Sequence, residues 1–248
     1  MGKNNLIFGI HPLIEALEAG REIDKILLKR GLRSSEVSHI MDVAKERTIP
    51  VQIVPEERLT RLTRKQHQGV IAFISEIEYT QLDQLIPMLY EEGRSPFVVL
   101  LDGLTDVRNF GAIARTAECA GVDAIIIPER GSVSVTADAV KTSAGALHRI
   151  PVCRVSSIQA AVTLLQENGI QIVAASEKAA DIYTESELSL PLGLVLGAED
   201  HGVSQDVLRR ADKIVRIPQA GAIGSLNVSV AGGILIYEVV RQAGLGAE

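Results

Sequence analysis

The stretch FVVLLDGLTDVRNFGAIARTAECAGVDAIIIP, residues 97–128, predicts a strand, a loop, a helix near 110–120 and a second strand. Asn109 occupies the expected N-cap of this helix and Gly121 the expected C-cap. Such units often bind nucleotides, but the glycine fingerprint G-x-G-x-x-G is missing after the first strand. The loop and helix offer Asn109 and Arg115 instead. These two residues either contact a ligand or serve only as a capping amide and a solvated cation.

A second polar loop lies in LVLGAEDHGVS, residues 194–204. An apolar strand stops at Gly197, and Glu199 lies in a tight turn between two glycines. A glycine at the carboxyl end of a strand lets backbone amides approach a ligand closely. A carboxylate beside it can orient a substrate hydroxyl or take its proton, although an acidic surface turn is the alternative interpretation.

The third loop lies in IPQAGAIGSLNVSVAGGILIYEVV, residues 217–240, where a glycine-rich segment leads through Ser225, Leu226 and Asn227 into a helix. Two adjacent glycines inside a helix cost about 1 kcal/mol each relative to alanine. We therefore expect a ligand or another backbone to approach them closely. Since all three loops follow strands of one parallel sheet, they should meet at the edge where α/β proteins bind ligands.

Apolar runs alternate with amphipathic stretches along the chain, which indicates an α/β protein with mostly parallel strands. Residues 1–76 predict a small four-stranded domain, with Ser34 as the N-cap of its second helix. Residues 96–248 predict a larger domain. Between them, residues 77–95 hold a polar helix that Pro87 interrupts, and we interpret this segment as a linker.

The composition excludes several classes of protein. Its 46% hydrophobic and 23% charged residues are typical of a folded globular chain, and 3% aromatic residues argue against a single-strand binder built on stacking platforms. The two cysteines and five histidines show no metal-ligand spacing, so we expect no metal. We expect a cytoplasmic protein, because no apolar run has the length of a membrane span and no signal-peptide pattern is visible.

Charge is distributed unevenly over a chain whose net charge is −6. Residues 1–70 carry 12 Lys and Arg against 9 Asp and Glu. This excess peaks in a short cluster that contains no carboxylate: Arg58, Arg61, Arg64 and Lys65. The cluster suits contact with RNA phosphates, with a solvated surface as the alternative.

The three loops resemble, in order and spacing, the three motifs of the SpoU (TrmH) family of RNA 2′-O-methyltransferases of the SPOUT class. The matching runs are NFGAIARTA (109–117), VLGAEDHGV (195–203), and IPQ followed by SLNVSVA (217–231). The run KTSAGALHRIPV (141–152) is similar to the segment between the motifs. FGIHPLIEALEAG (8–20) and HQGVIAFI (67–74) resemble the small L30e-like substrate-binding domain of many members.

This resemblance implies a C-terminal parallel-sheet domain with a deep trefoil knot, a homodimer formed through that domain, and S-adenosyl-L-methionine as cofactor. It implies that Gly197, Ile217 and Leu226 hold the cofactor. It also assigns a set of residues to the catalytic neighbourhood: Asn109, Arg115, Glu199, Ser225 and Asn227. Because a guanidinium is effectively always protonated, we interpret Arg115 as a phosphate ligand rather than as the base.

Members with this domain layout are closest to the enzyme that methylates a guanosine of large-subunit ribosomal RNA, which is the function we expect. Methylation of transfer RNA or of another ribosomal site is one alternative. A non-catalytic RNA-binding or ribosome-assembly protein is a second, and it predicts a disrupted motif residue, which is not seen. An oxidoreductase on an ordinary Rossmann sheet would require the missing glycine fingerprint.

Overall fold

The computed structural model describes residues 6–63 and 65–244, which form two compact units. The first contains residues up to Glu78, and the second contains most of the chain from Tyr79 onward. Each unit has its own sheet and its own buried core, so each is described by itself.

The N-terminal unit is a four-stranded sheet with the order β1-β4-β2-β3. Strand β4 runs antiparallel to both β1 and β2, and only β2 and β3 are parallel. The expectation of mostly parallel strands is therefore wrong for this unit, because apolar periodicity does not encode strand direction. Its elements are β1 (Leu6–Phe8), α1 (Ile10–Glu18), β2 (Ile23–Lys29), α2 (Ser35–Glu46), β3 (Val51–Val54), α3 (Glu56–Leu62) and β4 (Val70–Ile74).

Two small cores cover the two faces of this sheet. Helices α1 and α2 contribute Leu13 and Ile40 to one, and α3 contributes Leu59 to the other. Ser34 caps α2 as predicted, since its Oγ accepts a hydrogen bond of 3.2 Å from the backbone N–H of Val37.

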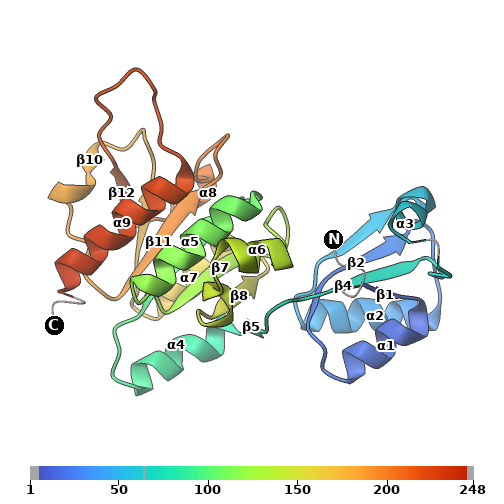
Figure 1. The fold of residues 1–248 in the computed structure, drawn as a ribbon. Helices are drawn as coiled ribbons and strands as arrows, with labels where there is room; N and C mark the ends of the chain where they lie inside the picture. Colours follow the sequence, from blue (N-terminus) through green and yellow to red (C-terminus); the bar gives the residue numbers. More distant parts are fainter. Residues whose placement is uncertain (1–5, 64, 245–248) are drawn as a thin grey trace. The chain divides into compact units, whose positions relative to one another are not determined.

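The C-terminal unit is built on an eight-stranded sheet with the order β10-β12-β9-β11-β6-β7-β8-β5, in which every pairing is parallel (Figure 1). Its strands are β5 (Tyr79–Thr80), β6 (Phe97–Asp102), β7 (Ala124–Pro128), β8 (Val152–Val155), β9 (Gln171–Ala175), β10 (Asp181–Ile182), β11 (Leu192–Gly197) and β12 (Lys213–Arg216).

Helices cover both faces of this sheet, as expected for strands that are buried on both sides. On one face α5 packs against α6 and α9, and on the other α7 packs against α4 and α8 (Figure 1). The helices are α4 (Leu82–Glu91), α5 (Val107–Cys119), α6 (Ala137–Thr142), α7 (Ile158–Glu167), α8 (Gln205–Leu208) and α9 (Val228–Ala243), with 3₁₀ turns η1 (Ala146–His148) and η2 (Tyr183–Glu185).

The segment 77–95, expected to be a linker, contains β5 and α4. Strand β5 pairs with β8, and α4 buries Leu85, Ile86 and Leu89 in the same core as α7. Pro87 lies inside α4 on its exposed side and does not end the helix. The apolar side chains of α4 recur at helical spacing and form a packing face, which gives this segment a place in the C-terminal unit.

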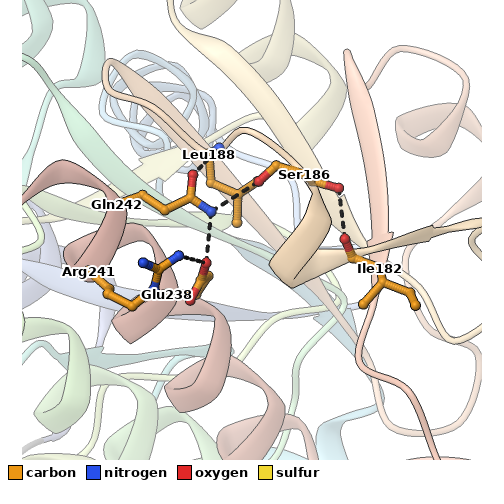
Figure 2. Close-up of polar contacts among 6 residues, drawn as sticks. All are labelled: Ile182, Ser186, Leu188, Glu238, Arg241 and Gln242. Atoms are coloured by element: carbon orange, nitrogen blue, oxygen red, sulfur yellow. Dashed lines mark hydrogen bonds and ion pairs between the residues drawn. The ribbon is translucent and has the colours of Figure 1, made fainter.

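The C-terminal half of α9 is tied to the segment that precedes β11 (Figure 2). The side-chain amide of Gln242 donates to Ser186 O at 3.0 Å and accepts from Leu188 N at 2.8 Å. It also donates to the buried Glu238 at 2.8 Å. Hydrogen bonds from Arg241 hold the pKa of the Glu238 carboxyl below its ordinary value. These contacts fix the position of α9 along its own axis.

Candidate active site

Helix α5 begins one turn earlier than the sequence suggested. Its first residue is Val107, and Asp106 is the N-cap, with a carboxylate oxygen that accepts from the backbone N–H groups of Arg108 at 2.9 Å and Asn109 at 2.8 Å. The prediction of Asn109 as N-cap is therefore wrong. Both Asp and Asn favour this position, and Asp106 takes it. As a consequence the side chain of Asn109 is available for other contacts.

The Asn109 side chain joins a hydrogen-bonded trio with Glu199 and Asn227. Its Nδ2 donates to Glu199 Oε1 at 2.7 Å, and Asn227 Nδ2 donates to the same oxygen at 2.7 Å. Asn227 Nδ2 also lies 3.0 Å from Asn109 Oδ1, which accepts. One residue comes from each of the three predicted loops. Two amides therefore fix one oxygen of an exposed carboxylate at the protein surface.

Asn227 is held in turn by its role as the N-cap of α9. Its Oδ1 accepts from the backbone N–H of Ser229 at 3.0 Å and from that of Val230 at 3.4 Å. The hydroxyl of Ser229 donates to the same oxygen at 2.6 Å. The amide oxygen thus caps the helix while the amide nitrogen orients Glu199. This double role explains the spacing of Asn227 and Ser229 in the run SLNVSVA.

A pocket of about 300 Å³ opens beside this trio at the carboxyl edge of the sheet. It is lined by the loop after β9, the turn after β11, β12 with the loop behind it, and the start of α9. Apolar side chains such as Leu196 and Leu235 form part of its wall. Five of the predicted site residues line it: Gly197, Glu199, Ile217, Ser225 and Leu226.

The turn that carries Glu199 folds back on the end of β11. Ala198 and Gly202 form an antiparallel bridge with hydrogen bonds of 3.2 and 2.9 Å. A Cβ on Gly197 would lie 2.0 Å from Gly202 C and 2.1 Å from Val203 N. Position 197 therefore has no space for any side chain, because the obstructing atoms belong to backbone.

The two adjacent glycines of α9 differ in how closely other atoms pack against them. A Cβ on Gly232 would approach the Leu196 side chain to 2.8 Å, whereas one on Gly233 would meet only Thr116 Cγ2, at 3.8 Å. Close packing of the Leu196 side chain from β11 thus explains Gly232, where the sequence argument expected a ligand or another backbone, and it does not explain Gly233.

The remaining predicted residues lie apart from the trio. Arg115 is exposed on α5, about 240° around the helix from Asn109, and has no polar partner within the part of the chain that the structure describes. Arg58, Arg61 and Lys65 are exposed in the N-terminal unit, where Lys65 Nζ lies 4.8 Å from the centre of the Phe8 ring. Arg64 lies outside the described residues.

Several contributors were not singled out from the sequence. Asp106 and Ser229 support the trio, and Asp102 accepts from the backbone N–H of Ser204 at 2.8 Å. His201 Nδ1 lies 2.5 Å from Asp200 Oδ1. Only Asp106 had a readable signal, as an Asp one residue before a helical pattern.

Two features are absent from residues 6–63 and 65–244. No group of three or more His, Cys, Asp or Glu side chains there is arranged to hold a metal ion. No helix in those ranges combines the length and the apolar character needed to cross a bilayer.

Both units of the chain match known protein families. The SpoU rRNA Methylase family matches residues 96–237, and the RNA 2′-O ribose methyltransferase substrate-binding family matches residues 6–80. A Staphylococcus haemolyticus relative assigned to the TrmH family of tRNA/rRNA methyltransferases is 38% identical over 237 residues, which cover 96% of this chain and 95% of the relative.

Two solved structures share the fold over nearly the whole chain. The AdoMet-bound rRNA methyltransferase from Sinorhizobium meliloti is 27% identical with a TM-score of 0.61, covering 96% of this chain and 87% of that one. The SpoU methyltransferase AviRb from Streptomyces viridochromogenes, in complex with AdoMet, is 25% identical with a TM-score of 0.60, covering 96% and 89%.

The fold and the site thus define an α/β protein of the methyltransferase type that the sequence motifs indicated. The chain belongs to the SpoU rRNA methylase family.

We predict opposite effects for alanine at two glycines of this site. Gly197→Ala should lower the free energy of unfolding by more than about 3 kcal/mol, because backbone atoms occupy the position of the new Cβ. Gly233→Ala should raise it by up to about 1 kcal/mol, because alanine favours the helix and meets only an ordinary contact. Guanidinium chloride titration of both variants measures the difference. Equal stability of the two would contradict the close approach at Gly197.

Proposed function

We propose that this protein transfers a methyl group from S-adenosyl-L-methionine to the ribose 2′-hydroxyl of an RNA, and that the acceptor is a guanosine of large-subunit (23S) ribosomal RNA. One observation carries the proposal. The three motif loops meet in a carboxylate fixed by two amides, Glu199 with Asn109 and Asn227, at the mouth of a small-molecule pocket. Family membership and the two AdoMet-bound neighbours support the reaction and its cofactor.

The pocket suits S-adenosylmethionine. Leu196, Leu226 and Leu235 offer an apolar surface for an adenine ring. Ser176, Glu177 and the backbone around Gly197 offer polar partners for a ribose and an amino acid group. We propose that Gly197, Ile217 and Leu226 hold the cofactor, in part through backbone groups that glycine leaves accessible.

Bound S-adenosylmethionine supplies an electrophilic methyl on a sulfonium, which the 2′-hydroxyl attacks in line. Positive charge disperses in this step, so positioning of the acceptor accounts for much of the rate. The Glu199 carboxylate, already fixed by Asn109 and Asn227, has a second oxygen with no partner within residues 6–63 and 65–244. That oxygen can accept a hydrogen bond from the acceptor nucleotide. Ser225, at the pocket rim, supplies a further hydroxyl.

Arg115 has a separate role in this proposal. Its exposed guanidinium, directed away from the trio of its own chain, is available to an RNA phosphate or to a site in a second chain. A guanidinium presents a fork of N–H donors that matches a phosphate, and it does not readily accept a proton.

The N-terminal unit favours a ribosomal acceptor. It matches the substrate-binding family and presents exposed Arg58, Arg61 and Lys65. We propose that it is an L30e-like RNA-binding domain and that the protein acts in the cytoplasm, where ribosomal RNA is processed. Transfer RNA is the second candidate, because the Staphylococcus haemolyticus relative is named for both kinds of RNA.

We further propose that the C-terminal unit is knotted and forms a homodimer. Membership of the SpoU rRNA methylase family supports the knot, because the resemblance to that family implies it. Val230 and Tyr237 lie two turns apart on α9 and expose 51% and 50% of their surfaces. An apolar stripe of this kind is a candidate dimer face.

Methyl transfer tests the proposed function directly. Purified protein with methyl-labelled S-adenosylmethionine should place label in 2′-O-methylguanosine of unmodified large-subunit ribosomal RNA and not in transfer RNA. Label in transfer RNA alone would exclude the ribosomal acceptor but would still support the methyl-transfer reaction.

In this assay Arg115→Ala should lower single-turnover transfer on the order of 10²-fold, with cofactor affinity within a few fold. Arg209→Ala, another exposed arginine, is the control and should transfer normally.

RNA binding by the basic cluster has a salt signature. Arg61→Glu should weaken RNA binding and reduce the slope of log K against log salt by roughly 0.7–0.9 for each phosphate that is no longer neutralised. Lys45→Glu makes the same charge change on α2, at the opposite face of the N-terminal sheet, and should leave the slope unchanged. Filter binding between 50 and 200 mM salt, the range over which phosphate neutralisation has large effects, measures both. Identical slopes for wild type and Arg61→Glu would show that Arg61 lies on a solvated surface and does not contact RNA.

The dimer proposal is tested by sedimentation. Tyr237→Arg should shift the protein toward the monomer, because it places a charge in the proposed apolar contact. Met88→Arg, on α4 at the other face of the sheet, changes an equally exposed apolar residue and should leave the mass unchanged. A wild type that sediments as a monomer at all concentrations would exclude the dimer.

A further inference from the structure

A second cavity lies at the same edge of the C-terminal sheet as the cofactor pocket. Its volume is about 460 Å³, and it opens beyond the carboxyl ends of β6, β7 and β8. Its lining includes six polar residues: Asp102, Thr105, Ser156, Gln159, Asp200 and His201. Four of them contribute neither to the trio nor to the cofactor pocket: Asp102, Thr105, Ser156 and Gln159.

One turn separates the two cavities. Asp200 and His201 line both of them, so the turn closed by the Ala198–Gly202 bridge is their common wall. A Cβ added to Gly103 would lie 3.3 Å from His201 Nε2, which shows that the imidazole packs against the loop after β6. A ligand in the second cavity therefore lies next to one in the first.

We propose that the second cavity binds the base of the acceptor nucleotide, so that the ribose lies at the rim on the side of Glu199 and the phosphate lies at the rim as well. This inference rests on the proposed methyl transfer and deepens it by naming the acceptor subsite. Transfer requires the acceptor ribose to meet the cofactor methyl, and the second cavity shares Asp200 and His201 with the cofactor pocket.

The charges of the cavity set the orientation of the nucleotide. Asp102 and Asp200 disfavour a phosphate inside, and their carboxylates can accept hydrogen bonds from N–H groups of a base. Asp102 is already oriented by the N–H of Ser204, which bonds Oδ2. Arg130, with 85% of its side chain exposed, lies at the rim and can pair with the phosphate.

Filling the cavity tests the proposal. Ser156 is exposed, follows β8 and caps no helix, so Ser156→Trp should block the cavity without unfolding the protein. Ser95→Trp makes the same exchange at an exposed serine before β6, at the opposite edge of the sheet. Thr105→Val removes one hydroxyl with little change of shape. The measurements are single-turnover transfer to whichever of 23S ribosomal RNA or transfer RNA the wild type methylates, S-adenosylmethionine affinity by calorimetry, and the melting temperature.

We expect Ser156→Trp to lower transfer on the order of 10²-fold and Thr105→Val to lower it about three- to tenfold. Cofactor affinity should stay within about twofold for both, and Ser95→Trp should match the wild type. Normal transfer by Ser156→Trp would overturn the acceptor subsite and leave the methyltransferase function intact. Loss of cofactor binding by a folded Ser156→Trp would also overturn it, because the cavity would then belong to the cofactor pocket. A wild type that methylates neither RNA would overturn the function and the subsite together.

Discussion

The parallel pairing of β6 with β11 is the constraint on which the site depends. It places Asp102 opposite Gly197, so that the chain leaves both strands at the same level of the sheet. From there β6 leads into α5 with Asn109, and β11 leads into the turn with Glu199. Because the side-chain period of a strand is two, a slip of one residue would place a leucine of β11 at the position of Gly193, where an added Cβ would already lie 2.9 Å from Ile172 Cδ1.

The start of α5 shows why this strand-loop-helix unit differs from a dinucleotide-binding one. In those proteins the free amides at the helix start bind a pyrophosphate. Here the carboxylate of Asp106 already occupies the amides of Arg108 and Asn109. An internal anion thus takes the place of the ligand, and the helix start can serve to orient side chains. In the proposed function the groups that act are instead the side chains of Asn109 and its hydrogen-bonded partner Glu199.

The sequence predicted most of the fold, because strands such as β6 and β11 are uninterrupted apolar runs and helices such as α2 have a clear cap. The sequence did not predict the features that depend on contacts between residues far apart in the chain. The direction of β4 depends on its partners, and the place of α4 depends on the core formed with α7. At the site, the motif residues were visible as residue types at known spacings. Their bonds were not, because Asn109 and Asn227 lie 118 positions apart and meet only in the folded chain.

Helix α9 is secured at both ends by side-chain amides: Asn227 at its start and Gln242 near its end. At 1.5 Å per residue these anchors lie about 22 Å apart on one rigid rod. A rigid helix keeps this spacing, so the contacts of Gln242 with Ser186 and Leu188 help to fix the place of Asn227 and, through it, that of Glu199.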